Sequence, residues 1–181
     1  VTYDPTYAYE LAVIIQNGLH RMYSLQENVF YYITVMNENY QHPDMPAGVE
    51  DGIIKGMYLL QDSHKKSKKH VQLLGSGTIL REVIEAARLL KEDFSVSADI
   101  WSVTSFNELR RDGLAVERHN RMHPDKPAQQ CYVSQQLGGR VGPIIAATDY
   151  MKLYADQIRA FVPGRYVVLG TDGFGRSDTR S

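Results

Sequence analysis

The spacing of apolar residues changes at residue 75, and this change predicts a strand followed by a helix. Residues 71–74 form a short apolar run, VQLL. Beyond the glycine turn at 75–77, apolar residues recur at 79, 83, 86 and 90, the spacing of a helix buried on one face. A side-chain oxygen of Ser76 or Thr78 is expected to cap this helix. The stretch therefore predicts half of a strand–helix–strand unit.

The rest of the chain after residue 49 repeats this alternation. We expect strands at 57–61, 71–75, 97–103, 143–147 and 165–169, and further helices at 106–122, 129–137 and 150–161. Strands that alternate with helices predict an α/β fold with a mostly parallel sheet and helices on both faces. The first strand enters through a predicted hairpin around 64–70, so we expect it to be an antiparallel edge strand beside the second.

The end signals of two helices are clear in the sequence. Ser105 precedes the helix at 106–122 and Glu108 occupies the capping-box position, three residues on. Charged residues dominate that helix, so most of it is predicted to face water, and Pro124 and Pro127 follow its end. Thr148 or Asp149 is expected to cap the helix at 150–161.

The first 48 residues have a different pattern. Asp4-Pro5 predicts the start of a helix that runs to about Tyr23, and Gly18 within it indicates a close packing contact. Three tyrosines near its start are predicted to be buried with their hydroxyls at a polar edge: Tyr3, Tyr7 and Tyr9. Residues 28–36, NVFYYITVM, predict a central strand covered on both faces. Residues 37–48 predict a linker between domains.

Composition and charge exclude several classes of protein. The chain is 43% hydrophobic and 23% charged with a formal charge of −1, which predicts a globular protein without a general affinity for nucleic acid. The lysine-rich segment at 64–70 predicts a solvated hairpin tip rather than a nucleic-acid patch. Cys131 is the only cysteine, so no internal disulfide can form, which suits the cytoplasm. No apolar run approaches the ~20 residues that a membrane span needs.

The glycine turn at 75–77 is the first candidate site. A dinucleotide fingerprint needs G-x-G-x-x-G, and Leu80 stands at the third glycine position; a P-loop string is absent. A structural turn is the favoured interpretation. The helix that follows could still accept a small anion or a nucleotide at residues 75–78, and this alternative stays open.

The histidines are the second candidate. His119 and His123 are four residues apart, which places two potential ligands on one helical face, but no H-E-x-x-H motif accompanies them. We therefore expect no metal site there. His42 lies in the predicted linker, where a domain junction could hold an active site, although a surface position is favoured.

The third candidate is the loop at 170–178, GTDGFGRSD. It follows the last predicted strand at its carboxyl end, where α/β folds place ligand loops. Asp172 and Asp178 flank Arg176, and Phe174 lies between glycines. Either a catalytic role or packing of Phe174 into a partner subunit fits this composition. The sequence shows no complete active site.

Longer strings carry a resemblance to a known family. The chain contains YDPTYAYELAVIIQNGLHRMY, ENVFYYITVMNENYQHPDMP, VQLLGSGTILREVIEAA, WSVTSFNELRRDG, ATDYMKLYADQIRAFVP and YVVLGTDGFGRSD. In this order, over essentially the whole chain, they resemble the homodimeric pyruvate dehydrogenases of bacteria. More distantly, the glycine turn, the W-x-V-T-S-F-x-E-L string and the D-G-F-G loop resemble the C-terminal domain of transketolase-like enzymes.

The resemblance implies a fold and a division into domains. Residues 1–48 would end the middle domain, which binds the pyrimidine half of the cofactor. Residues 49–181 would form a transketolase-like C-terminal domain, a three-layer fold with a mostly parallel five-stranded sheet and one antiparallel strand. The start at Val1 and the stop after the D-G-F-G loop imply a segment of a longer chain, incomplete at its C-terminus.

The resemblance also implies a function for the longer parent. That enzyme would decarboxylate pyruvate oxidatively and pass the acetyl group to lipoyl groups of a dihydrolipoyl acetyltransferase partner, as a cytoplasmic homodimer with thiamine diphosphate and Mg²⁺. The family's G-D-G cofactor motif does not occur here, so we expect no catalytic, cofactor or metal residue in this chain. Three residues are predicted to lie at the dimer interface: Phe174, Arg176 and Asp178. The alternative is a non-catalytic assembly or regulatory domain with a ligand at residues 75–78.

Overall fold

A five-stranded sheet forms the centre of the computed structural model, which describes residues 1–63 and 69–173. Its strands lie in the order β3 (Tyr58–Gln61), β5 (Ser97–Ser102), β4 (His70–Gly75), β6 (Ile144–Ala147), β7 (Tyr166–Leu169). The pairs β5–β4, β4–β6 and β6–β7 are parallel, and β3 pairs with β5 in the antiparallel direction. The predicted mostly parallel sheet with one antiparallel edge strand is confirmed.

The predicted hairpin between the first two strands is wrong. β3 pairs with β5, with Tyr58 opposite Ser102, so β5 separates β3 from β4. Val71 to Gly75 of β4 are buried, which suits a central strand with parallel partners on both sides. The partly exposed β3 therefore takes the edge. The hairpin tip at 64–68 lies outside the described residues.

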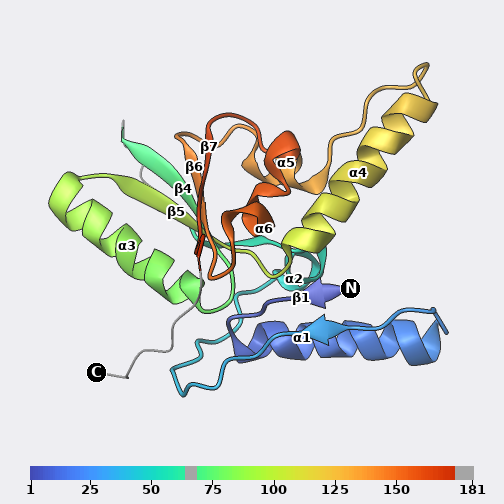
Figure 1. Cartoon of the computed structure of the whole chain (residues 1–181), viewed down its shortest axis with the longest axis horizontal. Helices are drawn as coiled ribbons and strands as arrows, with labels where there is room; N and C mark the ends of the chain where they lie inside the picture. The colour runs from blue at the N-terminus through green and yellow to red at the C-terminus, as the bar shows by residue number, and fades with distance from the viewer. Residues whose placement is uncertain (64–68, 174–181) are drawn as a thin grey trace.

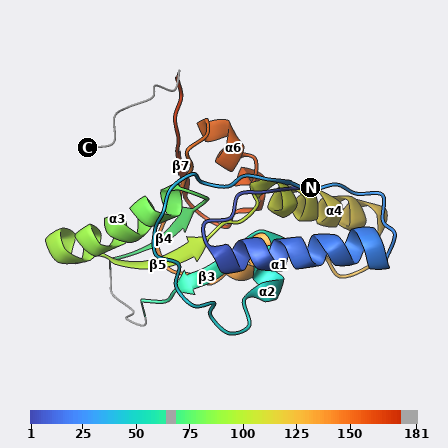
Figure 2. The same ribbon diagram turned by 90° about the horizontal axis from the view of Figure 1, so that it is seen from below.

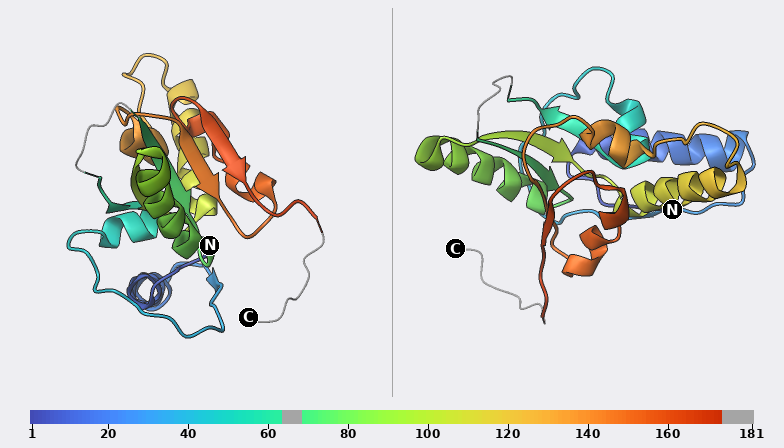
Figure 3. Two further views of the ribbon diagram at one scale, coloured as in Figure 1. Left: turned by 90° about the vertical axis from the view of Figure 1, so that its left-hand side faces the viewer. Right: turned by 90° about the horizontal axis from the view of Figure 1, so that it is seen from above.

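Helices cover both faces of the sheet (Figure 1). On one face lies α3 (Ile79–Phe94), whose Leu80 and Val83 pack with Val71 and Leu73 of β4. Figure 3 shows the sheet's strong twist beneath this helix. The other face carries α4 (Phe106–Met122), α5 (Tyr132–Leu137) and α6 (Lys152–Asp156), which share a larger core with the sheet. The result is a three-layer α/β domain.

The helix ends follow the predictions in one case and depart from them in two. Ser105 Oγ accepts a hydrogen bond from the Glu108 N–H at 3.0 Å, so this predicted cap of α4 is confirmed. No side chain caps α3, because the Thr78 hydroxyl donates to Met36 Sδ at 2.7 Å instead. The predicted helix at 150–161 is two short pieces, α6 and the 3₁₀ turn η2 (Arg159–Phe161).

The N-terminal segment packs along one edge of this domain. It consists of β1 (Thr2–Tyr3), α1 (Ala8–Leu19), the π-helical turn η1 (His20–Ser24) and β2 (Tyr32–Ile33). β1 and β2 form a two-stranded parallel sheet. Seen from below, α1 runs alongside α2 (Glu50–Lys55), with which it shares contacts (Figure 2). The predicted linker at 37–48 contains no helix or strand.

The start of α1 differs from the prediction. The helix begins at Ala8, so Asp4 is not its N-cap. Its buried residues are Glu10, Ile14 and Gly18. This stripe packs in a cluster with Tyr3, with Ile53 of α2 and with Tyr58 of β3. The predicted close contact at Gly18 is confirmed, because an added Cβ would lie 3.3 Å from the Tyr31 ring.

The predicted central strand at 28–36 is wrong. β2 has two residues, and Phe30, Tyr32 and Val35 are 77%, 63% and 70% exposed. β1 is its neighbour in the sheet, and no layer of the described chain covers these side chains. The segment is apolar, but in this structure several of its apolar side chains are exposed at the surface. Exposed apolar faces of this kind are typical of interaction surfaces.

Candidate functional site

The carboxyl ends of β4 and β6 form the place where this fold would hold a ligand. The two strands are parallel neighbours, but the chain continues from β4 to α3 on one face and from β6 toward α6 on the other. Such a point, where the connections part, is where open α/β sheets bind ligands. A pocket of about 200 Å³ lies there. It is lined by Asp4, Pro5, Thr34, Val35, Met36, Ser76, Gly77, Thr78, Thr148, Asp149 and Tyr150.

The glycine turn at 75–77 borders this pocket but does not fit a phosphate group. A Cβ on Gly75 would lie 2.7 Å from Leu80 Cα, so this glycine allows the close approach of α3 to its strand. Among the described residues, two carboxylates line the pocket, those of Asp4 and Asp149, and no lysine, arginine or histidine does. A phosphate would therefore meet like charge, which outweighs the attraction of one helix N-terminus.

Asp4 ties the N-terminal segment to the sheet domain through hydroxyl groups. Its carboxylate is buried and accepts hydrogen bonds from Thr34 Oγ1 at 2.7 Å, Tyr150 Oη at 3.0 Å and Tyr154 Oη at 2.5 Å. Its backbone N–H donates to the carbonyl oxygen of Thr104. Asp4 therefore binds the segment after β2 and the residues around α6 together.

Glu10 forms a second buried junction, which sequence reasoning missed. Its Oε1 accepts from Tyr58 Oη at 2.7 Å and from Ser102 Oγ at 2.6 Å. Its Oε2 accepts from the backbone N–H groups of Thr6 and Tyr7 at 2.5 and 2.9 Å. The side chain is fully buried, and its partners lie on β3, β5 and the chain before α1. Four donors to one carboxylate make a structural anchor.

The tyrosines of these junctions stay protonated far into alkaline conditions. Burial, together with the nearby Glu10 charge, raises the pKa of Tyr58. Burial and the hydrogen bond to Asp4 likewise raise the pKa of Tyr154. The predicted burial of Tyr3 and Tyr7 is confirmed, and the Tyr3 hydroxyl donates to the carbonyl oxygen of Ile54.

The buried carboxylate of Asp99 lies at the opposite edge of the sheet, near the amino ends of β4 and β5. His70 Nε2 lies 3.0 Å from Asp99 Oδ2, and the two side chains are 8% and 5% exposed. Asp99 also accepts from the Ser63 N–H and from Gln72 Nε2. Burial alone would raise the pKa of Asp99, but these hydrogen bonds and His70 hold it below its ordinary value. Arg140 lies 3.6 Å from the same carboxylate.

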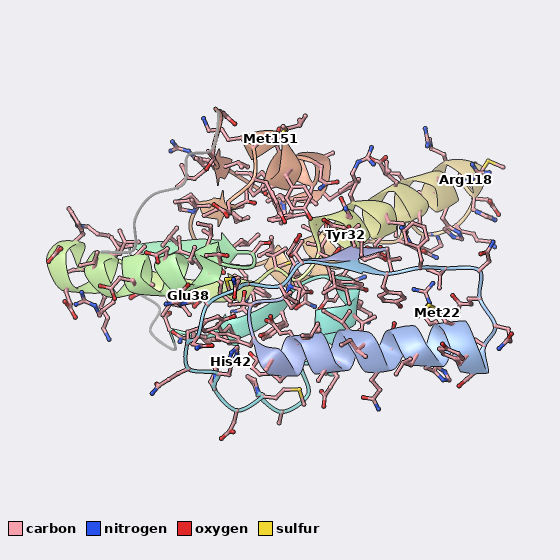
Figure 4. The ribbon with its side chains drawn as sticks, turned by 60° about the horizontal axis from the view of Figure 1, so that its bottom comes forward. Met22, Tyr32, Glu38, His42, Arg118 and Met151 are labelled. Carbon is pink, nitrogen blue, oxygen red and sulfur yellow. The ribbon has the colours of Figure 1, made fainter. Side chains whose placement is uncertain are left out.

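The histidines that the sequence singled out do not assemble a metal site. The rings of His119 and His123 stack at 4.3 Å, and His119 Nε2 already pairs with Gln129. His42 Nδ1 accepts from the Ala8 N–H at 3.1 Å, close to the start of α1, and Figure 4 shows it on the surface with Glu38. Within residues 1–63 and 69–173, no group of three or more His, Cys, Asp or Glu side chains could hold a metal ion.

Only part of the loop at 170–178 is described. Asp172 accepts a hydrogen bond from the Lys152 N–H and pairs with Lys152 Nζ at 3.0 Å, and these contacts lower the pKa of Asp172. The loop start is thus fixed to α6. Phe174, Arg176 and Asp178 lie outside the described residues, so their assignment to an interface stays a prediction.

A groove of about 820 Å³ between β2 and α6 is lined partly by apolar side chains, including Tyr32, Met151 and Leu153, the first two labelled in Figure 4. In the portion of the chain that the structure describes, no helix has the length and apolar character to cross a bilayer.

Two protein families match this chain. Residues 56–181 match the family described as "Transketolase-like TK C-terminal domain". Residues 1–43 match the "Pyruvate dehydrogenase E1 component middle domain". The boundary between the two matches falls between residues 43 and 56, in or next to the irregular stretch after β2.

Relatives and solved structures agree with these matches. The "Pyruvate dehydrogenase E1 component" of Pseudomonas aeruginosa is 69% identical over 180 residues, and that of Escherichia coli (strain K12) is 56% identical over 182. Each match covers 99% of this chain and 20% of the relative, so the chain spans about a fifth of these proteins. The transketolase of Campylobacter jejuni aligns with 97% of this chain and 22% of its own, with a TM-score of 0.61 at 17% identity, which shows a shared fold.

Proposed function

The chain belongs to the family of transketolase-like C-terminal domains, and from that premise we propose that it is the C-terminal portion of a pyruvate dehydrogenase E1 component. The observation that carries this proposal is the high identity to proteins of that name along nearly the whole chain. The second family match, to the middle domain of the same component, supports it. The parent would oxidatively decarboxylate pyruvate and transfer the acetyl group to lipoyl groups.

Thiamine diphosphate and Mg²⁺ would be the parent's cofactors, and the residues of this chain do not fit them. From residues 1–63 and 69–173, the pocket at the ends of β4 and β6 receives two carboxylates and no basic side chain, the wrong charge for a diphosphate. The chain also has no G-D-G string; its D-G pairs are Asp51-Gly52, Asp112-Gly113 and Asp172-Gly173. We therefore assign catalysis to other parts of the parent, and no catalytic residue to this chain.

The role that we assign to this chain is structural. Residues 1–48 would be the end of the middle domain, and residues 49–181 the C-terminal domain. Asp4 and Glu10 would hold the two together, because their carboxylates accept hydrogen bonds from Tyr154 on one side and from Tyr58 and Ser102 on the other. A domain fixed in this way would keep the middle domain's orientation in the parent.

The proposed partners follow from the same assignment. The parent would be a cytoplasmic homodimer that works with a dihydrolipoyl acetyltransferase. Phe174, Arg176 and Asp178 are our proposed dimer contacts. Substitution of Phe174 by alanine in the full-length protein should weaken the dimer in sedimentation, and an unchanged dissociation constant would remove this residue from the interface.

An activity assay of the full-length protein that contains this sequence tests the proposal. The protein should release CO₂ from pyruvate and acetylate an isolated lipoyl domain only when thiamine diphosphate and Mg²⁺ are present. A mass shift of the lipoyl domain by one acetyl group is the readout. Turnover of a sugar phosphate instead of pyruvate would contradict the proposal. The alternative of a regulatory domain with an anion at residues 75–78 has no support, given the two carboxylates there.

A further inference from the structure

Two buried hydroxyl groups at the ends of β4 and β6 have unused hydrogen-bonding capacity. Ser76 and Thr148 are each 4% exposed, and both line the pocket of about 200 Å³. Among the described residues, the Ser76 hydroxyl has no hydrogen-bond partner. Thr148 Oγ1 accepts from the Tyr150 N–H at 3.2 Å, and its own proton has no acceptor there. Buried hydroxyls normally pair with protein, water or a ligand, so a bound ligand would use the hydrogen-bonding capacity left in this pocket.

The Ser76 hydroxyl faces open space rather than a sealed core. In residues 1–63 and 69–173, Glu108 Oε1 is the single side-chain nitrogen or oxygen that is closed to solvent and lacks a hydrogen bond. The Ser76 oxygen therefore remains accessible, although the residue as a whole is nearly buried. The pocket is the space that Ser76 lines, so its oxygen is available to a ligand.

The charge around this pocket is negative and uncompensated. Asp4 is buried in its wall, Asp149 lies at its exposed side, and none of the lysines, arginines and histidines that the structure describes lines it. In the part of the chain that the structure describes, Asp4 forms no ion pair, and its partners are the neutral hydroxyls of Thr34, Tyr150 and Tyr154. A buried carboxylate without a counter-charge is costly, so a cation would stabilise it.

We propose that this pocket binds a monovalent cation, potassium or one of similar size. Apart from the Met36 thioether, the polar side chains among its described lining residues carry carboxylates and hydroxyls, whose oxygens are the ligands that hard cations prefer. A divalent ion fits less well, because the pocket has two carboxylates and no third acidic or histidine ligand. The bound ion would contact Asp4 of the N-terminal segment, Ser76 after β4 and Thr148 after β6. It would thereby link the turn after β4, where Ser76 lies, to the segments that Asp4 already joins through Tyr150 and Tyr154.

Hydrogen exchange in the full-length protein that contains this sequence tests this site directly. Peptides that span residues 72–80 and 144–151 are followed by mass spectrometry in potassium chloride and in N-methylglucamine chloride of equal ionic strength. At a potassium concentration about ten times the dissociation constant, exchange through local opening should slow by about tenfold. Peptides from the amino edge, such as those that contain Val96 and Ser97, should not respond.

Three variants distinguish the loss of cation binding from a general loss of stability. Ser76→Ala and Thr148→Val each remove a proposed oxygen ligand at nearly constant volume, and the potassium effect should disappear in both. Ser134→Ala is the matched control, because its hydroxyl donates to the carbonyl oxygen of Phe161 and lies outside the pocket; potassium should still protect this variant. Two independent ligand variants keep the test decisive if one of them does not fold.

Several results would overturn the proposal. Equal exchange in the two salts would show that no potassium binds, and protection that persists in both ligand variants would place the ion elsewhere. Protection by magnesium or calcium without any by potassium would contradict the monovalent assignment. Because the readout is local exchange, failure here is distinct from an absence of pyruvate turnover.

Discussion

The two edges of the sheet hold buried carboxylates by opposite means. At the carboxyl edge and the adjoining β3–β5 junction, Asp4 and Glu10 accept hydrogen bonds from hydroxyls and backbone amides, and no basic side chain of the described residues is among their partners. At the amino edge, Asp99 lies beside His70 and Arg140. One edge thus depends on neutral donors and the other on groups that carry or can gain charge.

This difference sets how each edge responds to pH. Tyrosines donate to the carboxylates of the first edge, and their raised pKa values make that edge sensitive to alkali. The lowered pKa of Asp99 makes the amino edge sensitive to acid. Since the N-terminal segment docks through the tyrosine-rich junctions, we expect alkali to release the segment and acid to loosen the opposite end of the sheet.

The largest effect should come from loss of the Glu10 carboxylate. Glu10→Ala removes the acceptor of two backbone amides and two hydroxyls, of which Tyr58 keeps the Tyr9 hydroxyl at 2.6 Å, and we expect a loss of about 3–5 kcal/mol in the free energy of unfolding. Denaturant titration measures it. The matched control is Glu117→Ala on the exposed side of α4, which should cost no more than about 0.5 kcal/mol. Equal effects of the two would mean that Glu10 does not anchor the segment.

The amino edge can be disturbed without a change of charge, through Gly142. Its φ of +94° is left-handed, and an added Cβ would lie 1.9 Å from the His70 carbonyl oxygen. Gly142→Ala should therefore cost about 2–4 kcal/mol and displace His70 from Asp99. Gly139→Ala, with φ of +79° and nothing within 4 Å of the added Cβ, should cost only about 1–2 kcal/mol. Thermal unfolding compares the two, and indistinguishable midpoints would contradict the predicted clash.

Asp99→Asn tests the acid sensitivity of the amino edge. Because the pKa of Asp99 is lower when folded, its contribution is complete above the ordinary aspartate value of about 3.9 and is lost as the pH falls through the folded value. The variant should cost about 1–3 kcal/mol near neutral pH. Its stability should approach that of the unsubstituted chain in acid. A constant difference at every pH would remove the charge from the explanation.

Tyr154→Phe tests the alkaline sensitivity of the junction, with the smallest expected effect. The variant loses the hydrogen bond to Asp4, worth about 1 kcal/mol. The folded pKa of Tyr154 is raised, so its contribution is complete below about pH 10 and lost as the pH rises further. The cost of the substitution should therefore shrink in alkali. Tyr23→Phe, at an exposed position, serves as control and should change neither stability nor its pH profile.

The sheet domain could be predicted because its patterns are local. Residues 71–90 carry a strand and a helix in their own periodicity, and Ser105 signals the start of α4. The order of strands could not be predicted in full, because the partner of β3 depends on which strand best fills the centre. β4 is buried along nearly its whole length and lies at the centre of the sheet, between β5 and β6, and β3 pairs with β5 at the edge.

The carboxylate junctions at Asp4 and Glu10 could not be predicted in full, because most of their partners lie far along the chain. Asp4 before Pro5 has the composition of a helix cap, yet distant tyrosines determine its role. Glu10 offered a usable sign, because it lies on the same helical face as Ile14 and Gly18, four and eight residues on. An acidic residue in phase with a buried stripe predicts a buried anchor. The prediction of a central strand at residues 28–36 was wrong because apolar composition does not show whether the layer that covers a strand belongs to the same chain.

Calorimetric titration of thiamine diphosphate with Mg²⁺ tests the central claim most directly, that this chain is structural and holds no cofactor. The titration is done on the 181-residue chain and on the full-length protein that contains it, under identical conditions. We predict measurable binding to the full-length protein and none to the chain alone. Micromolar binding to the chain alone would contradict the account.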